Sequence, residues 1–169
     1  MYYDRSFVYA GTAAKEGAMN HDCAVGYASE ADINAWMELA ALVRDAFPGL
    51  SLGEYRENLL KAIAERRALC AKDAGGLLGV LILSEQCDGI GFLAVHPEAR
   101  RRGVASALVR MMLGALPADQ DVFVTTYRED DPLGAAPRAL YKRLGFKEAE
   151  LVTRCGYPCQ QFVFRRGSV

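Results

Sequence analysis

The sequence predicts an α/β fold, with a mostly antiparallel sheet that carries helices on both sides. The stretch Ile90–Val95 is apolar on both faces, as a buried central strand should be. Apolar residues then recur at helical spacing over Val104–Ala115. Upstream, the apolar runs 69–72 and 77–83 flank the glycine-bearing turn 73–76, which indicates a β-hairpin.

Two amphipathic helices are expected ahead of this hairpin, after a first strand over residues 23–27. The first helix follows a capping box of Ser29 and Asp32 and should end at Pro48. Its apolar stripe consists of Ile33, Trp36, Ala40, Val43 and Phe47. The second helix follows another capping box, of Ser51 and Glu54, and its inner face carries Tyr55, Leu59 and Ile63.

The C-terminal part predicts a strand, a helix and a final pair of strands. The strand covers residues 121–127 and the helix residues 135–143, with Gly145 suited to a left-handed cap. The last two strands, 146–153 and 159–166, should flank a turn at 156–158.

Length and charge favour one soluble globular domain. The chain has 169 residues, with 20 basic and 21 acidic side chains, so its overall charge favours neither nucleic acid nor an anionic membrane as a partner. No apolar run approaches the ~20 residues of a membrane span, and no signal peptide is expected. We expect residues 1–21 to form an N-terminal extension and residues 22–169 a single domain.

The five cysteines are scattered and form no CxxC pair. With only His21 and His96 available as further ligands, we do not expect a zinc site or any other metal. The cysteines are interpreted as reduced, mostly buried residues of a cytoplasmic protein.

The turn between the central strand and the next helix has the chemistry of an anion site. Its pattern is Arg100-x-x-Gly103-x-Ala105, directly before a helix whose first backbone N–H groups lack partners. Gly103 would let the backbone approach a phosphate, and arginines add charge-assisted hydrogen bonds. The alternatives are a solvated basic loop or a nucleic-acid patch, and the net charge of −1 argues against the patch.

The segment FLAVHPEARRRGVA, residues 92–105, resembles the signature of the GCN5-related N-acetyltransferase (GNAT) superfamily. Downstream, RALYKRLGF, residues 138–146, resembles the helix-plus-strand segment of the same family. The resemblance extends from about residue 25 to residue 164. It implies the GNAT fold: a mixed, mostly antiparallel sheet splayed at the central strand, with helices on both faces.

The resemblance also implies acetyl-CoA as co-substrate and a set of residues that bind it. The pantetheine arm would lie along Leu93, Ala94 and Val95. The pyrophosphate would lie in the turn and first helical residues, which are Arg100, Arg101, Arg102, Gly103, Val104, Ala105 and Ser106. Tyr141 stands where the family places a phenol at the CoA sulfur, as general acid; the alternative is an aromatic that packs on the sheet.

A general base is harder to identify. Many family members carry a glutamate on the central strand, where this chain has Gly89 and Gly91. These glycines could leave room for a ligand, or mark a bulge or a close sheet contact. Asp88 is the nearest carboxylate and Glu54 could reach from the helix side, although either could be a solvated surface acid, and a water chain would need no base.

The acceptor pocket would be edged, by resemblance, by Phe47, Glu54 and Tyr55, with Tyr127 and Arg128 at the end of the following strand. The alternative is that the aromatic residues on the two amphipathic helices belong to the core, which is the commoner role of such residues. Arg128 could equally pair with the acidic residues 129–131 in a surface loop.

The implied reaction is direct acetyl transfer to a primary amine of a small molecule or protein within a ternary complex. Two other functions stay open, a CoA-binding module without catalysis and a different phosphate-binding domain. An N-terminal arm or a shared last strand would be compatible with a homodimer.

Overall fold

The structure is a computed structural model, and it describes residues 23–167. Its strands are β1 (Ala24–Tyr27), β2 (Ala68–Asp73), β3 (Gly76–Leu83), β4 (Ile90–Val95), β5 (Val122–Tyr127), β6 (Lys147–Arg154) and β7 (Tyr157–Phe164). Its α-helices are α1 (Ile33–Leu42), α2 (Leu52–Ala64), α3 (Val104–Ala115) and α4 (Ala135–Arg143). Three short 3-10 turns cover Glu30–Asp32, Arg44–Ala46 and Pro97–Ala99.

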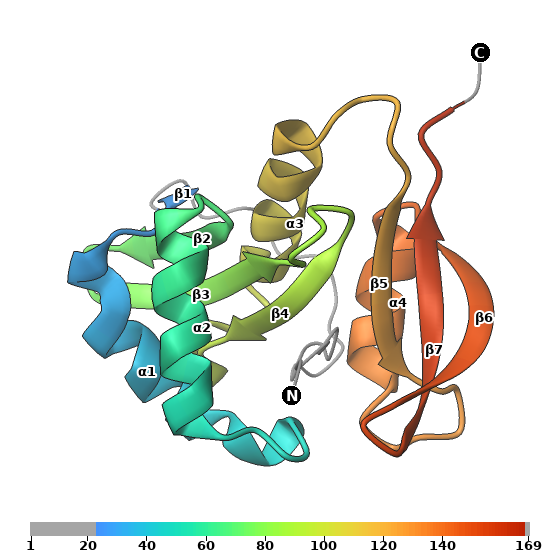
Figure 1. Ribbon diagram of the computed structural model, residues 1–169, viewed down its shortest axis with the longest axis horizontal. Coiled ribbons are helices and arrows are strands. Elements are labelled where there is room, and N and C mark those ends of the chain that lie inside the picture. The colour runs from blue at the N-terminus through green and yellow to red at the C-terminus, as the bar shows by residue number, and fades with distance from the viewer. Residues whose placement is uncertain (1–22, 168–169) are drawn as a thin grey trace.

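The strands form two antiparallel sheets that meet at one point. The first has the order β1-β2-β3-β4 and the second the order β5-β7-β6. Among the described residues, a parallel bridge between Gly89 and Phe123 joins them, and β4 and β5 diverge from there (Figure 1). This arrangement confirms the predicted α/β fold with a sheet splayed beside the central strand.

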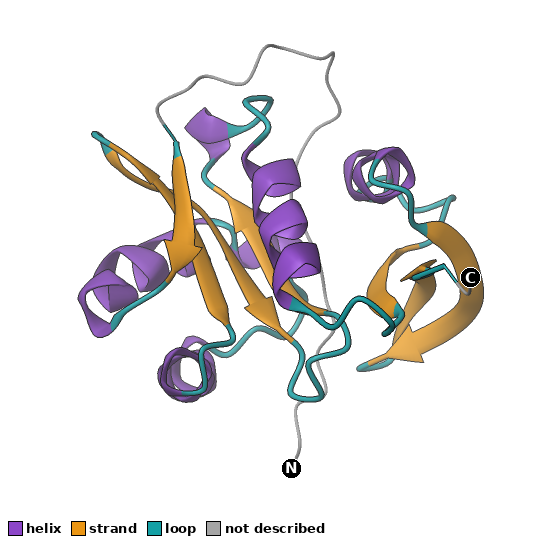
Figure 2. Ribbon diagram, turned by 90° about the horizontal axis from the view of Figure 1, so that it is seen from above, coloured by secondary structure: helices purple, strands orange, loops and turns teal. Residues whose placement is uncertain are grey.

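The helices lie in two layers, and each layer packs on its own core. In Figure 2, α1 and α2 lie on one side of the first sheet, and α3 lies on the other. The α1–α2 side buries Trp36, Leu59 and Phe92 together. The opposite core joins α3 and α4 to both sheets, with Leu108 of α3 and Leu140 of α4 in the same cluster. Because α3 and α4 share one core, they hold the two diverging sheets together.

The structure corrects two predicted boundaries. The first helix ends at Leu42, not at Pro48, because Ala46 and Phe47 donate i→i−3 bonds to Val43 and Arg44 in a 3-10 turn. Phe47 nevertheless reaches the core. The predicted turn at 156–158 is also wrong, because the left-handed residues of the hairpin are Cys155 (φ 48°) and Gly156 (φ 76°), and Pro158 already lies in β7.

Other expectations have mixed outcomes. The predictions for residues 1–21 lie outside the described residues. No helix within residues 23–167 is both long and apolar enough to cross a membrane. All the cysteines are free thiols, but only Cys70 and Cys159 are buried and Cys155 is exposed, so the prediction of mostly buried cysteines is wrong.

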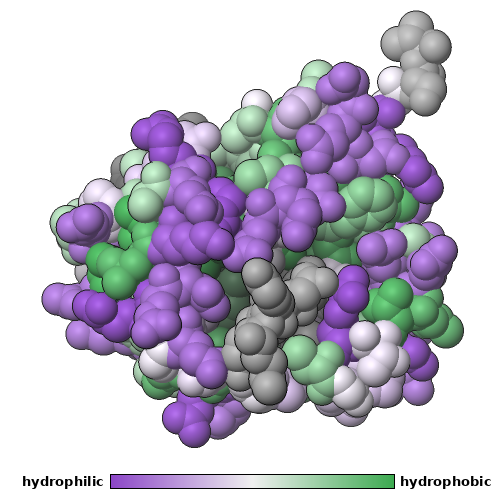
Figure 3. Space-filling view, viewed as in Figure 1, coloured by the Kyte–Doolittle hydropathy of each residue, from purple (hydrophilic) through white to green (hydrophobic). Residues whose placement is uncertain are grey.

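Figure 3 shows hydrophilic side chains over much of one face, with smaller apolar patches between them.

Candidate active site

The site is built around the junction of β4 and β5. The Phe123 N–H donates to the Asp88 carbonyl oxygen at 2.8 Å, and a Cβ added to Gly89 would lie 2.0 Å from the Phe123 carbonyl oxygen. Of the alternatives that the sequence left open for this glycine, Gly89 is therefore a close contact between the two sheets. At Gly91 the atoms nearest to an added Cβ would be backbone atoms of Ile82 and Leu83, at ordinary contact distances of 3.4–3.6 Å.

Beyond this junction, β4 has one edge that faces β5. Strand β4 pairs with β3 on one side, and among the described residues no strand pairs with its other edge. Leu93, Ala94 and Val95 lie on this stretch and their side chains are buried. A buried strand edge needs hydrogen-bond partners for its backbone groups, and a ligand in the gap would supply them.

At the opposite end of the gap, β5 is tied to the segment after α1. The Tyr127 hydroxyl donates to the Ala46 carbonyl oxygen at 2.5 Å. Burial raises the pKa of the Tyr127 phenol, so it stays protonated and a donor. The gap is therefore bounded by the Gly89–Phe123 junction at one end and by the Tyr127–Ala46 bond at the other.

The anion turn leads directly into α3. Arg101 and Gly103 both have left-handed backbone angles, with φ of 66° and 77°, and Gly103 is the N-cap residue. Within residues 23–167, no side chain caps this helix start. Val104, Ala105 and Ser106 have buried side chains, so the first-turn N–H groups and the positive end of the helix dipole remain for an anion.

The three arginines of the turn have different surroundings. Arg102 donates to Asp73 of the β2–β3 hairpin at 3.2 Å, and the pKa of Asp73 is lowered, first by the Gly75 N–H and then by Arg102. Arg101 is exposed. The Nε of Arg100 is buried and has no hydrogen-bond partner among the described residues. Arg100 and Arg101 are therefore better placed for a phosphate than Arg102.

Tyr141 lies on α4, on the face of the helix that packs on the second sheet, and its side chain is part of the core. Its ring contacts Phe146 and Phe162, with centroids 5.5 and 6.1 Å away. Both the core interpretation and the family role are compatible with this place, since α4 borders the gap from the same side as α3.

Arg138 positions α4, and sequence reasoning did not detect this role. Its buried guanidinium donates to the Tyr127 carbonyl oxygen at 3.1 Å, to Gln160 at 2.6 Å and to Glu148 at 2.6 Å. These bonds fix the helix one turn before Tyr141. The only sequence signal was Arg138 itself, a charged residue on a helix face that should be apolar.

The predicted acceptor-pocket residues mostly have structural roles. Phe47 packs on Phe92 with ring centroids 4.5 Å apart. Tyr55 is buried and its oxygen accepts from Trp36 Nε1 at 2.7 Å; burial also raises its pKa. The alternative that these aromatic residues belong to the core describes their contacts well.

Glu54 and Arg128 differ from those aromatic residues. Glu54 is exposed on the first turn of α2. The Arg128 guanidinium donates to the Cys159 carbonyl oxygen at 3.1 Å and to the Val152 carbonyl oxygen at 3.3 Å. These bonds tie Arg128 to the ends of β7 and β6, which is a structural use of its charge.

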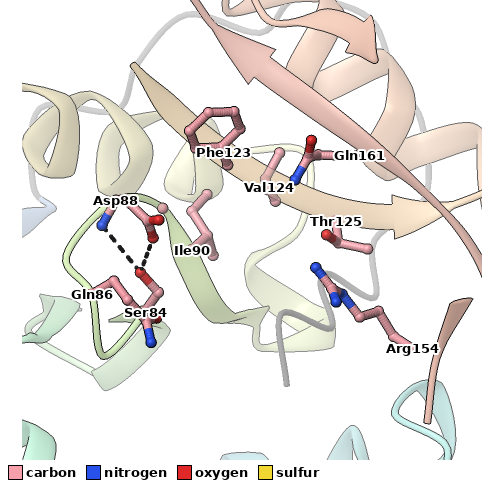
Figure 4. Close-up of a pocket in the computed structure, with 10 residues that line it drawn as sticks. Ser84, Gln86, Asp88, Ile90, Phe123, Val124, Thr125, Arg154 and Gln161 are labelled. Atoms are coloured by element: carbon pink, nitrogen blue, oxygen red, sulfur yellow. Dashed lines mark hydrogen bonds between the residues drawn. The ribbon is translucent and has the colours of Figure 1, made fainter. Parts of the chain in front are cut away.

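Asp88 lies at a cavity of about 300 Å³ beside the junction. The lining residues are Ser84, Gln86, Asp88, Gly89, Ile90, Phe123, Val124, Thr125, Arg154 and Gln161 (Figure 4). The Ser84 hydroxyl donates to Asp88 Oδ1 at 2.7 Å, and the Asp88 N–H donates back to Ser84 Oγ at 3.2 Å. Sequence reasoning missed Ser84, Thr125, Arg154 and Gln161, because only strand pairing brings them together.

No group of three or more His, Cys, Asp or Glu side chains in the described part of the chain is arranged to hold a metal ion. The polar groups of the site include backbone N–H groups, arginines, the Asp88 carboxylate and the Tyr141 phenol, besides the hydroxyl and amide groups that line the cavity. This is a set that suits anion binding and proton transfer.

Comparison with known families gives a direct match. The sequence model described as an acetyltransferase (GNAT) domain matches residues 64–148, which include β4, the anion turn and Tyr141. A mycothiol acetyltransferase from Mycolicibacterium vanbaalenii is 31% identical over 104 residues, which cover 59% of this chain and 34% of that protein. The chain thus spans about a third of the length of this curated relative.

Solved structures share the fold. A GNAT-family acetyltransferase from Bacillus cereus aligns with a TM-score of 0.68 and 22% identity, over 86% of this chain and 99% of that one. A spermidine N-acetyltransferase from Vibrio cholerae, solved with CoA and spermine, aligns with a TM-score of 0.62 and 18% identity, over 86% and 96% of the two chains. At these identities the likeness concerns the fold.

Proposed function

The chain belongs to the acetyltransferase (GNAT) family, and we propose that it is an N-acetyltransferase. It would move the acetyl group of acetyl-CoA to a primary amine of a small molecule or protein, by direct transfer in a ternary complex. The observation that carries this proposal is that, among the described residues, the start of α3 has no side-chain cap and the edge of β4 that faces β5 pairs with no strand, within the family fold. The division into an extension (1–21) and one domain (22–169) is part of the same proposal.

Acetyl-CoA would bind along the side of the gap that carries α3 and α4. The pyrophosphate would accept hydrogen bonds from the N–H groups of Gly103 to Ser106, with Arg100 and Arg101 supplying charge. The pantetheine amides would pair with the open edge of β4 at 93–95, as an added strand pairs with a sheet edge.

The transfer step requires three proton and charge movements. The neutral amine nitrogen attacks the thioester carbonyl carbon, and the oxyanion that forms accepts a hydrogen bond from a β4 backbone N–H. Collapse of this intermediate forms the amide and breaks the carbon–sulfur bond. The leaving thiolate takes a proton from Tyr141, and the attacking nitrogen loses one to a base or to water, so the products are the N-acetylated amine and CoA.

Asp88 is the carboxylate that we propose as the base. Ser84 holds one of its oxygens, which orients the carboxylate at the cavity wall beside the junction of β4 and β5. A proton from the amine could pass to the second oxygen directly or through one water molecule. Glu54 is exposed on α2 and does not line this cavity.

We expect this reaction to take place in the cytoplasm, in agreement with the free thiols of all the cysteines. A homodimer stays a prediction.

Isothermal titration with acetyl-CoA, with ATP as the comparison ligand, tests the proposal, followed by thiol release over a panel of amines. Micromolar binding of acetyl-CoA, weak binding of ATP and thiol release with at least one amine are the expected results. Binding of acetyl-CoA without turnover on any amine would favour the non-catalytic CoA-binding module. The absence of a carboxylate in β4 also supports that alternative. A protein that binds ATP but not acetyl-CoA would overturn the proposal.

A further inference from the structure

We propose that the cavity beside Asp88 is the acceptor site, and that it selects a small amine which also carries a carboxylate. The amine would lie toward Asp88 and the carboxylate toward Arg154. This inference rests on the proposed function and adds the chemical class of the substrate to it.

The cavity presents opposite charges from two different sheets. Asp88 belongs to the loop that leads into β4 of the first sheet, whereas Arg154 is the last residue of β6 in the second. Both line the same cavity of about 300 Å³, and Figure 4 shows the Arg154 guanidinium and the Asp88 carboxylate coming from different sides of it. A ligand that spans the cavity would meet an anion at one end and a cation at the other.

The cavity lies on the opposite face of the second sheet from Tyr141. Thr125 of β5 pairs with Gln161 of β7, and both line the cavity. The neighbouring pair, Val124 and Phe162, belongs to the core beneath α4 that contains Tyr141. Because side chains alternate along a strand, Thr125 and Gln161 point away from α4. An acceptor in the cavity would therefore approach the β4–β5 gap from the side opposite to acetyl-CoA, and the two would not compete for space.

The rest of the lining suits a short polar molecule. Ser84, Gln86, Thr125 and Gln161 supply hydroxyl and amide groups, whereas Ile90 and Phe123 supply apolar surface. The volume is at the lower end of the range for small-molecule pockets, about 300 to 1,000 Å³. An amino acid or a molecule of similar size fits these limits, and a long polyamine, with cations throughout its length, would bring a positive charge toward Arg154.

Charge selection of this kind has a clear energetic source. A planar guanidinium forms two parallel hydrogen bonds with a carboxylate, which adds both affinity and orientation. An amine without the carboxylate lacks this interaction, so its reacting nitrogen is less well positioned. The preference should therefore appear in kcat/KM, since orientation and binding both contribute to it.

The experiment compares matched acceptors that differ only in the carboxylate, measured by thiol release and, separately, by thermal shift in the presence of CoA. Suitable pairs are lysine and 1,5-diaminopentane, phenylalanine and 2-phenylethylamine, and alanine and ethylamine. We expect the carboxylated member of at least one pair to be preferred about 10-fold or more in kcat/KM. We also expect Arg154→Gln to abolish that preference while it leaves acetyl-CoA affinity unchanged.

The control is Arg110→Gln, which removes the same charge from an exposed position on α3 outside the cavity. It should leave the preference intact. Equal turnover of the two members in every pair, or a preference that survives Arg154→Gln, would overturn the inference while N-acetyltransfer itself stands. If no amine is acetylated, the proposed function fails, and the thermal shifts then test the cavity by themselves. Stabilisation by carboxylated amines that is lost in Arg154→Gln would support the cavity as a binding site for such amines. No stabilisation by carboxylated amines would overturn the inference.

Discussion

The carbonyl oxygen of Phe123 occupies the space that a side chain at residue 89 would need. A Cβ on Gly89 would lie 2.0 Å from that oxygen and 2.8 Å from the Phe123 carbonyl carbon, distances that no real Cβ tolerates. The chain thus uses a glycine to bring two strands of different sheets into contact at one point. From this point β4 and β5 diverge (Figure 1). The cavity beside Asp88 lies at this junction, and the proposed acetyl-CoA site borders the gap that results.

Gly89→Ala should separate the two sheets at their junction. Because the contact is with backbone atoms of Phe123, which cannot rotate away, we expect a loss of about 1 to 3 kcal/mol in the free energy of unfolding and a fall in activity. Chemical denaturation measures the loss. Gly53→Ala is the control: an added Cβ there meets nothing within 4 Å, and alanine in α2 should stabilise by about 0.5 to 1 kcal/mol. Equal stability of Gly89→Ala and wild type would contradict the steric argument.

Tyr141→Phe should separate catalysis from binding. Loss of the proposed proton donor should lower kcat about 100-fold, while the acetyl-CoA dissociation constant stays within about threefold, because the ring still packs on Phe146 and Phe162. Steady-state kinetics and isothermal titration measure the two quantities. The matched variant Tyr157→Phe also removes a hydroxyl from the second sheet, one bonded to Asp131, and should retain turnover. A Tyr141→Phe enzyme with wild-type kcat would remove Tyr141 from the mechanism.

Arg101→Gln should weaken acetyl-CoA binding by about 10-fold. Arg101 is exposed at the start of α3, where a phosphate would lie, and the loss should shrink at high ionic strength because salt screens exposed charges. Titration at two salt concentrations gives both numbers. Arg110→Gln, with the same change of charge farther along α3, should bind acetyl-CoA as wild type does. If both variants lose the same affinity, the effect is one of overall charge and not of the turn.

The pair of Asp32 and Lys72 should make stability depend on pH. Burial opposes ionisation of Asp32, but hydrogen bonds from Lys72 at 2.6 Å and from the Ser29 N–H at 2.8 Å outweigh it and lower the pKa of Asp32. A lowered carboxyl pKa stabilises the fold above the ordinary value of 3.8, and this contribution is lost as the pH falls through the folded-state pKa.

Asp32→Asn should therefore lower the free energy of unfolding by about 1 to 2 kcal/mol at pH 6, with a smaller difference from wild type at pH 3. Denaturant unfolding at both pH values measures it. Asp119→Asn, at an exposed position in the turn after α3, is the control and should show no such dependence. A difference between Asp32→Asn and wild type that is the same at both pH values would show that the ion pair is not responsible.

Local patterns predicted most of the elements and the family. The helices Val104–Ala115 and Ala135–Arg143 begin and end where their apolar spacing predicts, and the hairpin at 73–76 forms where its glycines stand. The motifs around Gly103 and Tyr141 were sufficient to identify the family that the domain match confirms. These features depend on neighbours in the chain, and a sequence displays such neighbours directly.

Long-range contacts decided the rest. Helical spacing placed Phe47 and Tyr55 on apolar helix faces, but it could not reveal that both rings pack on Phe92. It also could not reveal that Arg128 binds the backbone of β6 and β7. Arg154 and Asp88 are distant in sequence, and their common cavity exists only because two sheets diverge from a glycine contact. By itself the sequence determined the helices, the strands, the anion turn and the family, because periodicity and turn chemistry are local. The composition of the cavity was decided by tertiary structure alone, because strand pairing and the angle between the sheets bring its residues together.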